Sequence, residues 1–270
     1  MTYNGNKELM HMIKAVKKAT DILIFLSDSQ NSPVTLGQIA AHAGLNKATC
    51  SHLVSTLCET LMVQKVSRKT GYILGPQAYY LTRHGPYQQE LIKICYPVLR
   101  WLFGHVQATV QLTVVCEGMK YIINTIEGDI KLLESGVKIK QDELYATATG
   151  RTILANMEEE EVEHIIAKVG PPPADQWPGI ESLSQIQEEL RKIRQAGYTF
   201  IKRANDPRRL GYSCAIKKSG KVVAAIGISI NQDRVNDETH QMIIAKMKSA
   251  AREINRRLCF TDIGKESCAP

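Results

Sequence analysis

The side chains best suited to contact chemistry lie along one short stretch, residues 46–59. Its apolar positions recur every three or four residues, as on one face of a helix. They are Cys50, Leu53, Val54 and Leu57. The other positions carry mainly hydroxyls, an imidazole and an ammonium, and they are Lys47, Ala48, Thr49, Ser51, His52 and Ser55. Short donors of this kind suit the DNA major groove, which offers hydrogen-bond acceptors between two rows of phosphates. The stretch therefore predicts a recognition helix.

A shorter helix is expected just before it. Thr35 and Gln38 fit a capping box, in which each side chain satisfies a free backbone N–H at a helix start. Gly44 suits the left-handed residue that ends a helix, and Asn46 suits the N-cap of the next helix. These signals predict a helix-turn-helix, with Thr35 as a further candidate for DNA contact. The same geometry also occurs in proteins that never touch DNA, so the signals alone leave that alternative open.

A hairpin is expected after the second helix. The β-prone runs MVQKV (62–66) and YIL (72–74) flank the polar turn SRKTG, and two such runs around a turn are typical of a hairpin. Arg68 and Lys69 at its tip are placed to meet phosphates beside the groove. A helix-turn-helix followed by a hairpin is a winged helix.

The positive charge is concentrated in the same region. Eight Lys or Arg oppose four Asp or Glu in residues 1–75, so this part carries +4 of the chain's net +7. Such a distribution favours attraction to phosphate. The length of 270 residues suits two domains, and 44% hydrophobic with 23% charged content is ordinary for a globular protein.

An enzyme would need a nucleophile, a base or a metal set, and we find none arranged as a motif. The seven histidines are dispersed, the cysteines form no C-x-x-C pair, and no glycine-rich phosphate loop is present. Cys214 is the best single thiol, but a small buried hydrophobe or a pocket wall is the simpler interpretation. We therefore expect no catalytic residues, no metal site and no cofactor.

The sequence favours a cytoplasmic protein. The seven cysteines are odd in number and scattered, which a reducing compartment explains. No N-terminal stretch reads as a signal peptide, and the apolar run 22–26 is far too short to span a bilayer. We expect no membrane partner.

The remaining elements predict an α+β chain. An amphipathic helix over 13–26 precedes the helix-turn-helix, and Gly85-Pro86 marks a boundary. Helix-prone residues 87–106 form either a rod between domains or an ordinary core helix, and Pro97 could interrupt them. Strands are expected over 109–116, 119–128, 198–202, 212–216 and 221–230. Further helices are expected over 151–157, 158–169, 182–197 and 239–258.

Thr149 and Gly150 open the helix RTILANM (151–157). Free backbone N–H groups at a helix start can hold a carboxylate. Simple capping is the alternative, and the residues alone favour it.

Several segments resemble one family. IKAVKKATDILIFL (13–26), PVTLGQIAAHAGLNKATCSHLVSTL (33–57) and GYILG (71–75) resemble the DNA-binding domain of the IclR family of bacterial transcriptional regulators. LYATATGRTILANM (144–157), LRKIRQAGYTF (190–200) and SGKVVAAIGISI (219–230) resemble segments of its effector-binding domain.

The resemblance implies a winged helix-turn-helix, a linker helix and a GAF-like α/β domain with an antiparallel sheet that binds a small molecule. It also implies homodimers or dimers of dimers. We therefore expect a DNA-binding domain over 1–76, a linker over 77–86, an effector-binding domain over 87–262 and a flexible tail over 263–270.

The sequence departs from the family pattern at several positions. Ala48 and His52 stand where the family often has serine and arginine, and Leu61 stands where a glycine usually precedes the wing. The first two put the operator sequence in doubt but not the act of binding. YSCAIKKSG (212–220) replaces a usual Ala-Pro-hydrophobic run, so the pocket wall is expected to differ.

The favoured function is a ligand-responsive regulator that binds an operator in double-stranded DNA. Its effector is expected to be a small organic or aromatic acid, held by apolar walls, hydroxyls, a thiol and free N–H groups. The candidate residues are Leu133, Thr147, Ala148, Gly150, Cys214 and Ser229. One alternative is a metabolite-binding or catalytic α/β module whose winged helix pairs proteins. Another is a sensor of cysteine oxidation through Cys214 and Cys116.

Overall fold

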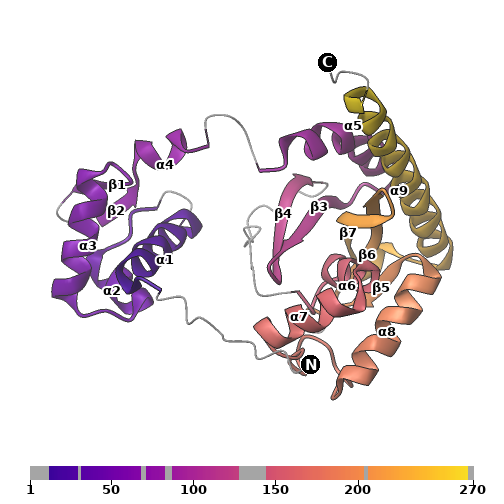
Figure 1. The fold of residues 1–270 in the computed structure, drawn as a ribbon, viewed down its shortest axis with the longest axis horizontal. Helices are drawn as coiled ribbons and strands as arrows, with labels where there is room; N and C mark the ends of the chain where they lie inside the picture. The colour runs from indigo at the N-terminus through magenta and orange to yellow at the C-terminus, as the bar shows by residue number, and fades with distance from the viewer. Residues whose placement is uncertain are drawn as a thin grey trace, which may run out of the picture. The chain divides into compact units, whose positions relative to one another are not determined.

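The computed structural model describes residues 12–29, 32–67, 71–82, 87–127, 144–203 and 206–266. The chain divides into two compact units, residues 1–86 and 87–270 (Figure 1). Each unit has its own buried cluster of apolar side chains, so each is described by itself.

The N-terminal unit is a winged helix-turn-helix, as the sequence predicts. Its helices are α1 (Lys14–Asp28), α2 (Leu36–Ala43) and α3 (Lys47–Glu59), followed by the antiparallel strands β1 (Val63–Ser67) and β2 (Gly71–Leu74). A short helix, α4 (Pro76–Tyr80), comes next. The core is formed by one apolar face from each long helix: Ile22 and Leu26, Ile39 and Ala40, and Cys50 and Val54.

The start of the wing is fixed by one close backbone approach. Val34 and Tyr72 exchange two backbone hydrogen bonds, with N···O distances of 2.9 and 2.8 Å. Gly71, which begins β2, has φ +106°, and a Cβ there would lie 2.3 Å from the carbonyl oxygen of Val34. Only glycine therefore lets β2 pair with both β1 and Val34.

Leu61 adopts a left-handed backbone conformation that glycine accommodates more easily. Its φ is +57°, and its side chain is 56% exposed. A left-handed conformation costs a residue with a Cβ about 1–2 kcal/mol. We expect Leu61→Gly to raise the free energy of unfolding of this unit by about 1 kcal/mol, because strain relief exceeds the added freedom of the unfolded chain. Urea denaturation followed by circular dichroism measures this difference.

Leu61→Ala is the matched control for that substitution. It removes the exposed apolar side chain but keeps a Cβ at positive φ. Equal stabilisation by alanine and glycine would show that the exposed side chain, and not the backbone, is responsible.

The C-terminal unit is built on a five-stranded antiparallel sheet in the order β4-β3-β7-β6-β5. The strands are β3 (Thr109–Cys116), β4 (Met119–Ile126), β5 (Thr199–Lys202), β6 (Arg209–Lys218) and β7 (Lys221–Asn231). The helices are α5 (Gln89–Val106), α6 (Ala148–Asn156), α7 (Glu159–Val169), α8 (Leu183–Ala196), the single turn η2 (Gln232–Arg234) and α9 (Asp237–Glu266).

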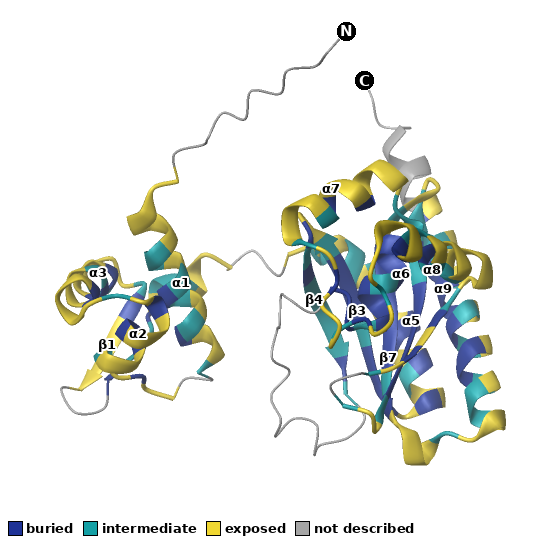
Figure 2. Cartoon of the chain, turned by 90° about the horizontal axis from the view of Figure 1, so that it is seen from below, coloured by how far each residue is buried: buried dark blue, intermediate teal, exposed yellow. Residues whose placement is uncertain are grey.

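Helices cover both faces of this sheet. Apolar residues of α5 and α9 pack with alternate residues of β3, β6 and β7 in the larger core. Helix α6 contacts β6, β7, β5 and β3 and also packs on α8. A separate apolar cluster joins α6, α7 and α8. Figure 2 shows the buried residues concentrated on the strands and on the inner sides of the helices. The expected α+β architecture with an antiparallel sheet is thus confirmed.

The structure decides one open alternative and changes one expectation. Helix α5 is continuous through Pro97, and it buries Cys95, Val98, Leu99 and Leu102, so it is a core helix. Helix α9 does not end at Leu258 but continues to Glu266. Residues 263–266 of the expected tail are therefore helical, and 267–270 lie outside the described residues.

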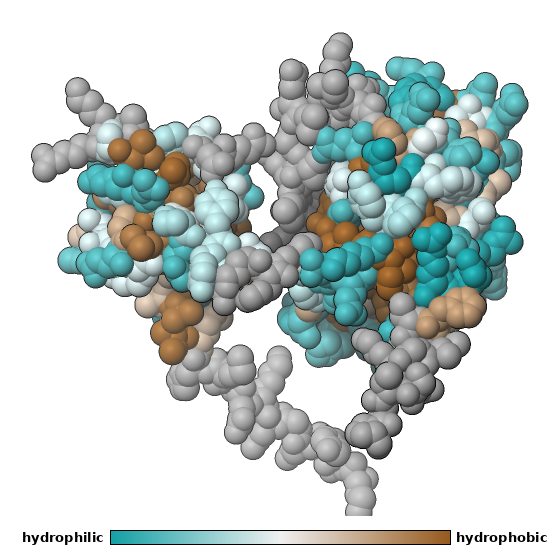
Figure 3. Space-filling model, turned by 90° about the horizontal axis from the view of Figure 1, so that it is seen from above, coloured by the Kyte–Doolittle hydropathy of each residue, from teal (hydrophilic) through white to brown (hydrophobic). Residues whose placement is uncertain are grey.

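Among the described residues, no helix is both long enough and apolar enough to cross a lipid bilayer. In Figure 3, the visible face of the larger unit shows hydrophilic side chains around a hydrophobic strip.

Candidate DNA-binding and ligand-binding sites

One face of α3 is fully available for contact. Lys47, Ala48, Thr49, Ser51, His52 and Ser55 are all exposed. The opposite face is buried, with Cys50 at 0% and Val54 at 1% exposure. Within the described part of α3, the only acid is Glu59, in the last turn. The helix therefore presents hydroxyls, an imidazole and an ammonium outward, as the sequence predicts.

Local capping fixes how α3 is presented. Asn46 caps it, because its Oδ1 accepts from the Thr49 N–H at 2.8 Å. Gly44 ends α2 with φ +59°, and the Leu45 N–H then donates to the Ala40 carbonyl at 2.9 Å. The imidazole of His42 stacks on Phe25 of α1 at 4.0 Å between ring centroids. The two caps set the angle between α2 and α3, and the ring stacking holds α2 against α1.

Thr35 has a defined structural role. It caps α2 reciprocally with Gln38: its hydroxyl accepts from the Gln38 N–H at 3.3 Å, and its own N–H donates to Gln38 Oε1 at 2.9 Å. The side chain is exposed, so DNA contact by Thr35 remains a proposal beside this capping role.

The wing adds a cation that the sequence reasoning did not select. Lys65 is exposed on β1, with its Nζ 5.7 Å from the centre of the Tyr72 ring. Its position on the outward side of a hairpin strand was the available signal. Arg68 and Lys69, the predicted phosphate contacts, lie outside the described residues.

The second candidate site begins with an unusual sheet face. A sheet covered by helices on both sides is normally apolar on both. The face under α6 instead carries several polar residues, while Val110, Leu112 and Val114 point to the α5 and α9 side. The residues on the α6 side include Thr109, Gln111, Thr113, Ser213 and Ser229.

Thr113 is the polar residue on this face that most clearly lacks a partner. Its side chain is 0% exposed, and its Oγ1 has no hydrogen-bond partner. A buried hydroxyl without a partner costs roughly 1–3 kcal/mol. A ligand that supplied the missing hydrogen bond would recover that cost.

The start of α6 lies directly on this face. Thr147 Oγ1 accepts from the Gly150 N–H at 3.3 Å and from Lys120 Nζ at 3.2 Å. Lys120 comes from β4 and is only 5% exposed. An ammonium and a helix N-terminus are both groups that favour a carboxylate beside them.

Three glycines allow this close packing. A Cβ at Gly150 would lie 1.9 Å from the Leu144 carbonyl oxygen. A Cβ at Gly227 would lie 2.4 Å from Thr149 Cγ2, and one at Gly211 would lie 3.3 Å from Ala148 Cβ. The first turn of α6 therefore sits against the backbone of β6 and β7.

The structure brings together four of the predicted effector residues. Thr147, Ala148 and Gly150 form the start of α6, and Ser229 pairs with Gly211 beneath it. Arg209 Nη1 lies 3.5 Å from Ser229 Oγ, and Arg209 Nε is paired with Asp206 Oδ2 at 3.6 Å. Leu133 lies outside the described residues.

Cys214 does not lie with this group. It points to the opposite face of the sheet, into the core formed with α5 and α9, and its Sγ lies 3.6 Å from the Gly197 carbonyl oxygen. Thr113 and Lys120 were missed instead. Two sequence signals could have found them. Polar residues occupy alternate positions of TVQLTVVC (109–116), and a lysine lies on the same face of its strand as Ile122.

The cysteines give no support to redox sensing through Cys214. Burial raises the pKa of the Cys95 and Cys214 thiols to about 12, so both stay protonated and weakly nucleophilic. Cys116 is exposed. Among the described residues, no group of three or more His, Cys, Asp or Glu side chains is arranged to hold a metal ion.

Comparison with known proteins gives consistent matches over both units. Residues 87–256 match the model of the bacterial transcriptional regulator IclR C-terminal family, and residues 15–67 match the IclR helix-turn-helix domain. The transcriptional repressor IclR of Escherichia coli is 23% identical over 248 residues, covering 90% of this chain and 89% of the repressor. The regulator KdgR of the same organism is 22% identical, with 93% and 94% covered.

Solved structures share the fold. An IclR homologue from Microbacterium hydrocarbonoxydans, solved in complex with 4-hydroxybenzoate, superposes with a TM-score of 0.72 at 16% identity. The superposition covers 90% of this chain and 98% of that one. At this identity the likeness concerns the fold alone.

Proposed function

Because this chain belongs to the IclR family of bacterial transcriptional regulators, we propose that its α3 reads an operator and that the start of α6 binds a small carboxylic acid. Its DNA-binding helix-turn-helix and its C-terminal effector domain follow from the family. The contact residues and the ligand class are proposals. We propose 1–76 as the DNA-binding domain, 77–86 as a linker and 87–262 as the effector domain.

The observation that carries the DNA proposal is the free outward face of α3. Lys47 and His52 can donate to phosphates or base edges, and the hydroxyls of Ser51 and Ser55 are short enough to reach the groove floor. The methyl side chain of Ala48 offers no hydrogen bond to a base, so specificity for the operator sequence is expected to rest on its neighbours. Lys65, Arg68 and Lys69 of the wing are the proposed phosphate contacts.

Selection of binding sites from randomised duplexes tests this proposal, because the selection itself identifies the operator. The full chain should enrich one sequence, and the two halves of that sequence should be inverted if the protein binds as a homodimer. Affinity for the selected site should fall steeply between about 50 and 200 mM salt. Enrichment of no sequence, or affinity that does not depend on salt, would contradict the proposal.

The observation that carries the ligand proposal is the unpartnered Thr113 hydroxyl on a polar face that also holds Lys120 and the start of α6. A carboxylate would lie at the α6 N-terminus beside Lys120, and its hydroxyl or ring substituent would reach toward Thr113. The 4-hydroxybenzoate bound to a relative of the same fold has both groups. A small organic or aromatic acid is therefore the class we propose.

We expect 4-hydroxybenzoate, or another small hydroxy acid, to bind the full chain in calorimetric titration. The neutral amide 4-hydroxybenzamide should bind at least about tenfold more weakly, because a charge-assisted hydrogen bond is worth roughly 1.5–3 kcal/mol. Lys120→Met should weaken binding of the acid but not of the amide.

Lys221→Met is the matched control for that experiment, because Lys221 is exposed at the start of β7. It removes the same charge and should leave both affinities unchanged. If acid and amide bind equally well to the unaltered chain, the carboxylate site is wrong.

Regulation then follows from differential affinity. An acid that prefers one arrangement of two DNA-binding units over another shifts the population toward it. Because half-sites are spaced by the helical repeat of DNA, a change in that arrangement alters operator affinity.

A further inference from the structure

A cavity lies at the other end of α6. It has a volume of about 370 Å³, and Asn156 of α6, the end of α8, the outer part of β6 and the middle of α9 line it. Four of its lining side chains are cationic: Arg194, Lys217, Lys248 and Arg252. No Asp or Glu occurs among the described residues that line it.

Two of the cations are held in place by neutral acceptors. Arg194 donates from Nε to the Ala155 carbonyl at 2.6 Å and from Nη2 to the Met157 carbonyl at 2.8 Å. Lys248 Nζ donates to the Ala196 carbonyl at 2.9 Å and lies 4.9 Å from the centre of the Tyr198 ring. Both groups lie at the C-terminal ends of helices, where cations are commonly found. No carboxylate neutralises them among the described residues that line the cavity.

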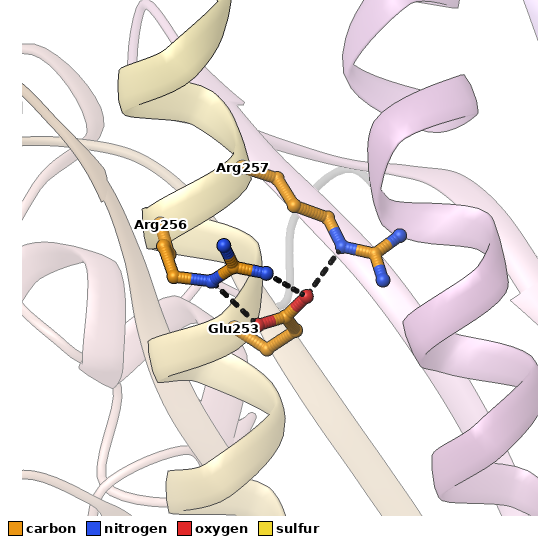
Figure 4. A network of polar contacts seen from close by, with 3 residues as sticks. All are labelled: Glu253, Arg256 and Arg257. Atoms are coloured by element: carbon orange, nitrogen blue, oxygen red, sulfur yellow. Dashed lines mark hydrogen bonds and ion pairs between the residues drawn. The ribbon is translucent and has the colours of Figure 1, made fainter.

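The other two cations have no ion-pair partner in the part of the chain that the structure describes. Lys217 is fixed through its backbone, because its N–H donates to Asn255 Oδ1 at 2.9 Å. Arg252 extends from α9. The acid next to it in sequence, Glu253, is engaged elsewhere: its carboxylate accepts from Arg256 at 2.9 Å and from Arg257 Nε at 2.8 Å (Figure 4). Glu253 therefore leaves the charge of the cavity uncompensated.

We infer that this cavity binds a small organic anion that carries at least two negative charges, such as a phosphate ester or a polycarboxylate. Like charges gathered around one volume repel each other, and a multivalent anion relieves that repulsion. Guanidinium groups bind carboxylate and phosphate through paired hydrogen bonds. The apolar wall of Ile193, Ala251 and the Tyr198 ring offers a surface for the carbon part of the ligand.

Size and position separate this site from the acid site proposed above. A volume of about 370 Å³ lies in the range of small-molecule sites. The cavity is lined by Asn156, the last residue of α6, whereas the proposed acid site is at Thr147–Gly150, where α6 begins. The inference does not depend on the identity of the effector.

Calorimetric titration of the full chain with citrate and with fructose 1,6-bisphosphate tests the inference, with acetate at matched ionic strength as the monovalent comparison. At least one of the two anions should bind saturably, and acetate should not. Which of the two binds tells a polycarboxylate site from a phosphate site.

The double variant Lys217→Ala/Arg252→Ala should weaken that binding by about tenfold or more, because each cation supplies a charge-assisted contact to the anion. The matched control is Lys202→Ala/Lys221→Ala, which removes two exposed lysines that do not line the cavity. It should change the affinity less than about twofold. Circular dichroism checks that both variants are folded.

Three results would overturn the inference: no saturable binding of either anion at millimolar concentration, equal losses in the two double variants, or binding of acetate as tight as that of the multivalent anions. A loss of affinity for duplex DNA alone in Lys217→Ala/Arg252→Ala, without anion binding, would assign the cations to DNA instead.

Discussion

Lys47→Glu should lower operator affinity by about 100-fold and yet stabilise the N-terminal unit slightly. Lys47 is the first residue of α3 and is exposed. A glutamate there would repel phosphate, and like-charge contacts cost several kcal/mol at an interface. The same glutamate lies at the positive end of the α3 dipole, where an acid contributes about 0.3–1 kcal/mol to stability. Opposite signs for binding and stability exclude simple unfolding as the cause.

Lys14→Glu is a closely matched control, because Lys14 is the first residue of α1 and is also exposed. It makes the same charge change at the same helical position and should give the same stabilisation. Its effect on operator affinity should be small. Fluorescence anisotropy with the selected duplex measures affinity, and thermal melting measures stability. If the two variants lose affinity equally, α3 has no special role and net charge alone governs binding.

Gly150→Ala is expected to destabilise the C-terminal unit by about 3 kcal/mol or more, and to abolish acid binding at the start of α6. The added Cβ would lie 1.9 Å from the Leu144 carbonyl oxygen, which is backbone and cannot rotate away. Overpacking of this kind usually costs about 1–3 kcal/mol, and more where backbone must shift. Urea denaturation monitored by tryptophan fluorescence measures the loss, because both tryptophans, Trp101 and the buried Trp177, lie in this unit.

Gly104→Ala provides the contrast. Gly104 lies within α5, and nothing lies within 4 Å of a Cβ built there. Alanine should therefore stabilise the same unit by about 0.5–1 kcal/mol, because it favours the helix. If both substitutions change stability alike, the contact between Gly150 and the Leu144 carbonyl is not what matters.

Sequence reasoning succeeded where the deciding contacts are local. Thr35 with Gln38, Gly44 and Asn46 each act within a few residues of the chain, so the helix-turn-helix and its outward face could be predicted in detail. The register of the wing could not be predicted from local signals. The glycine at Gly71 is required by its close approach to Val34, which lies much earlier in the chain. Leu61 could be singled out beforehand only because the family that the sequence resembles usually has a glycine there.

The ligand site was harder, because strand alternation gives two faces without saying which helix covers each. Cys214 and Ser213 are neighbours, yet Cys214 lies in the core with α9 and Ser213 lies under α6. Only the packing of α6 on Gly211 and Gly227 decides this. Lys120 and Thr113 were missed for the same reason. The cavity at the C-terminal end of α6 is lined by residues that range from 152 to 255 in the sequence. No motif or regular spacing in the sequence predicts it.

Helix α6 has nine residues, and its two ends border the two proposed ligand sites. At about 1.5 Å per residue, roughly 13 Å separates them. The glycines beneath its first turn leave it no room to sink toward the sheet, so a displacement at one end would be transmitted as movement of a rigid body. If occupancy of one site shifts the helix, thermodynamic reciprocity requires that each ligand change the affinity of the other by the same factor. The protein would then respond to two ligands that are coupled through the single short helix α6.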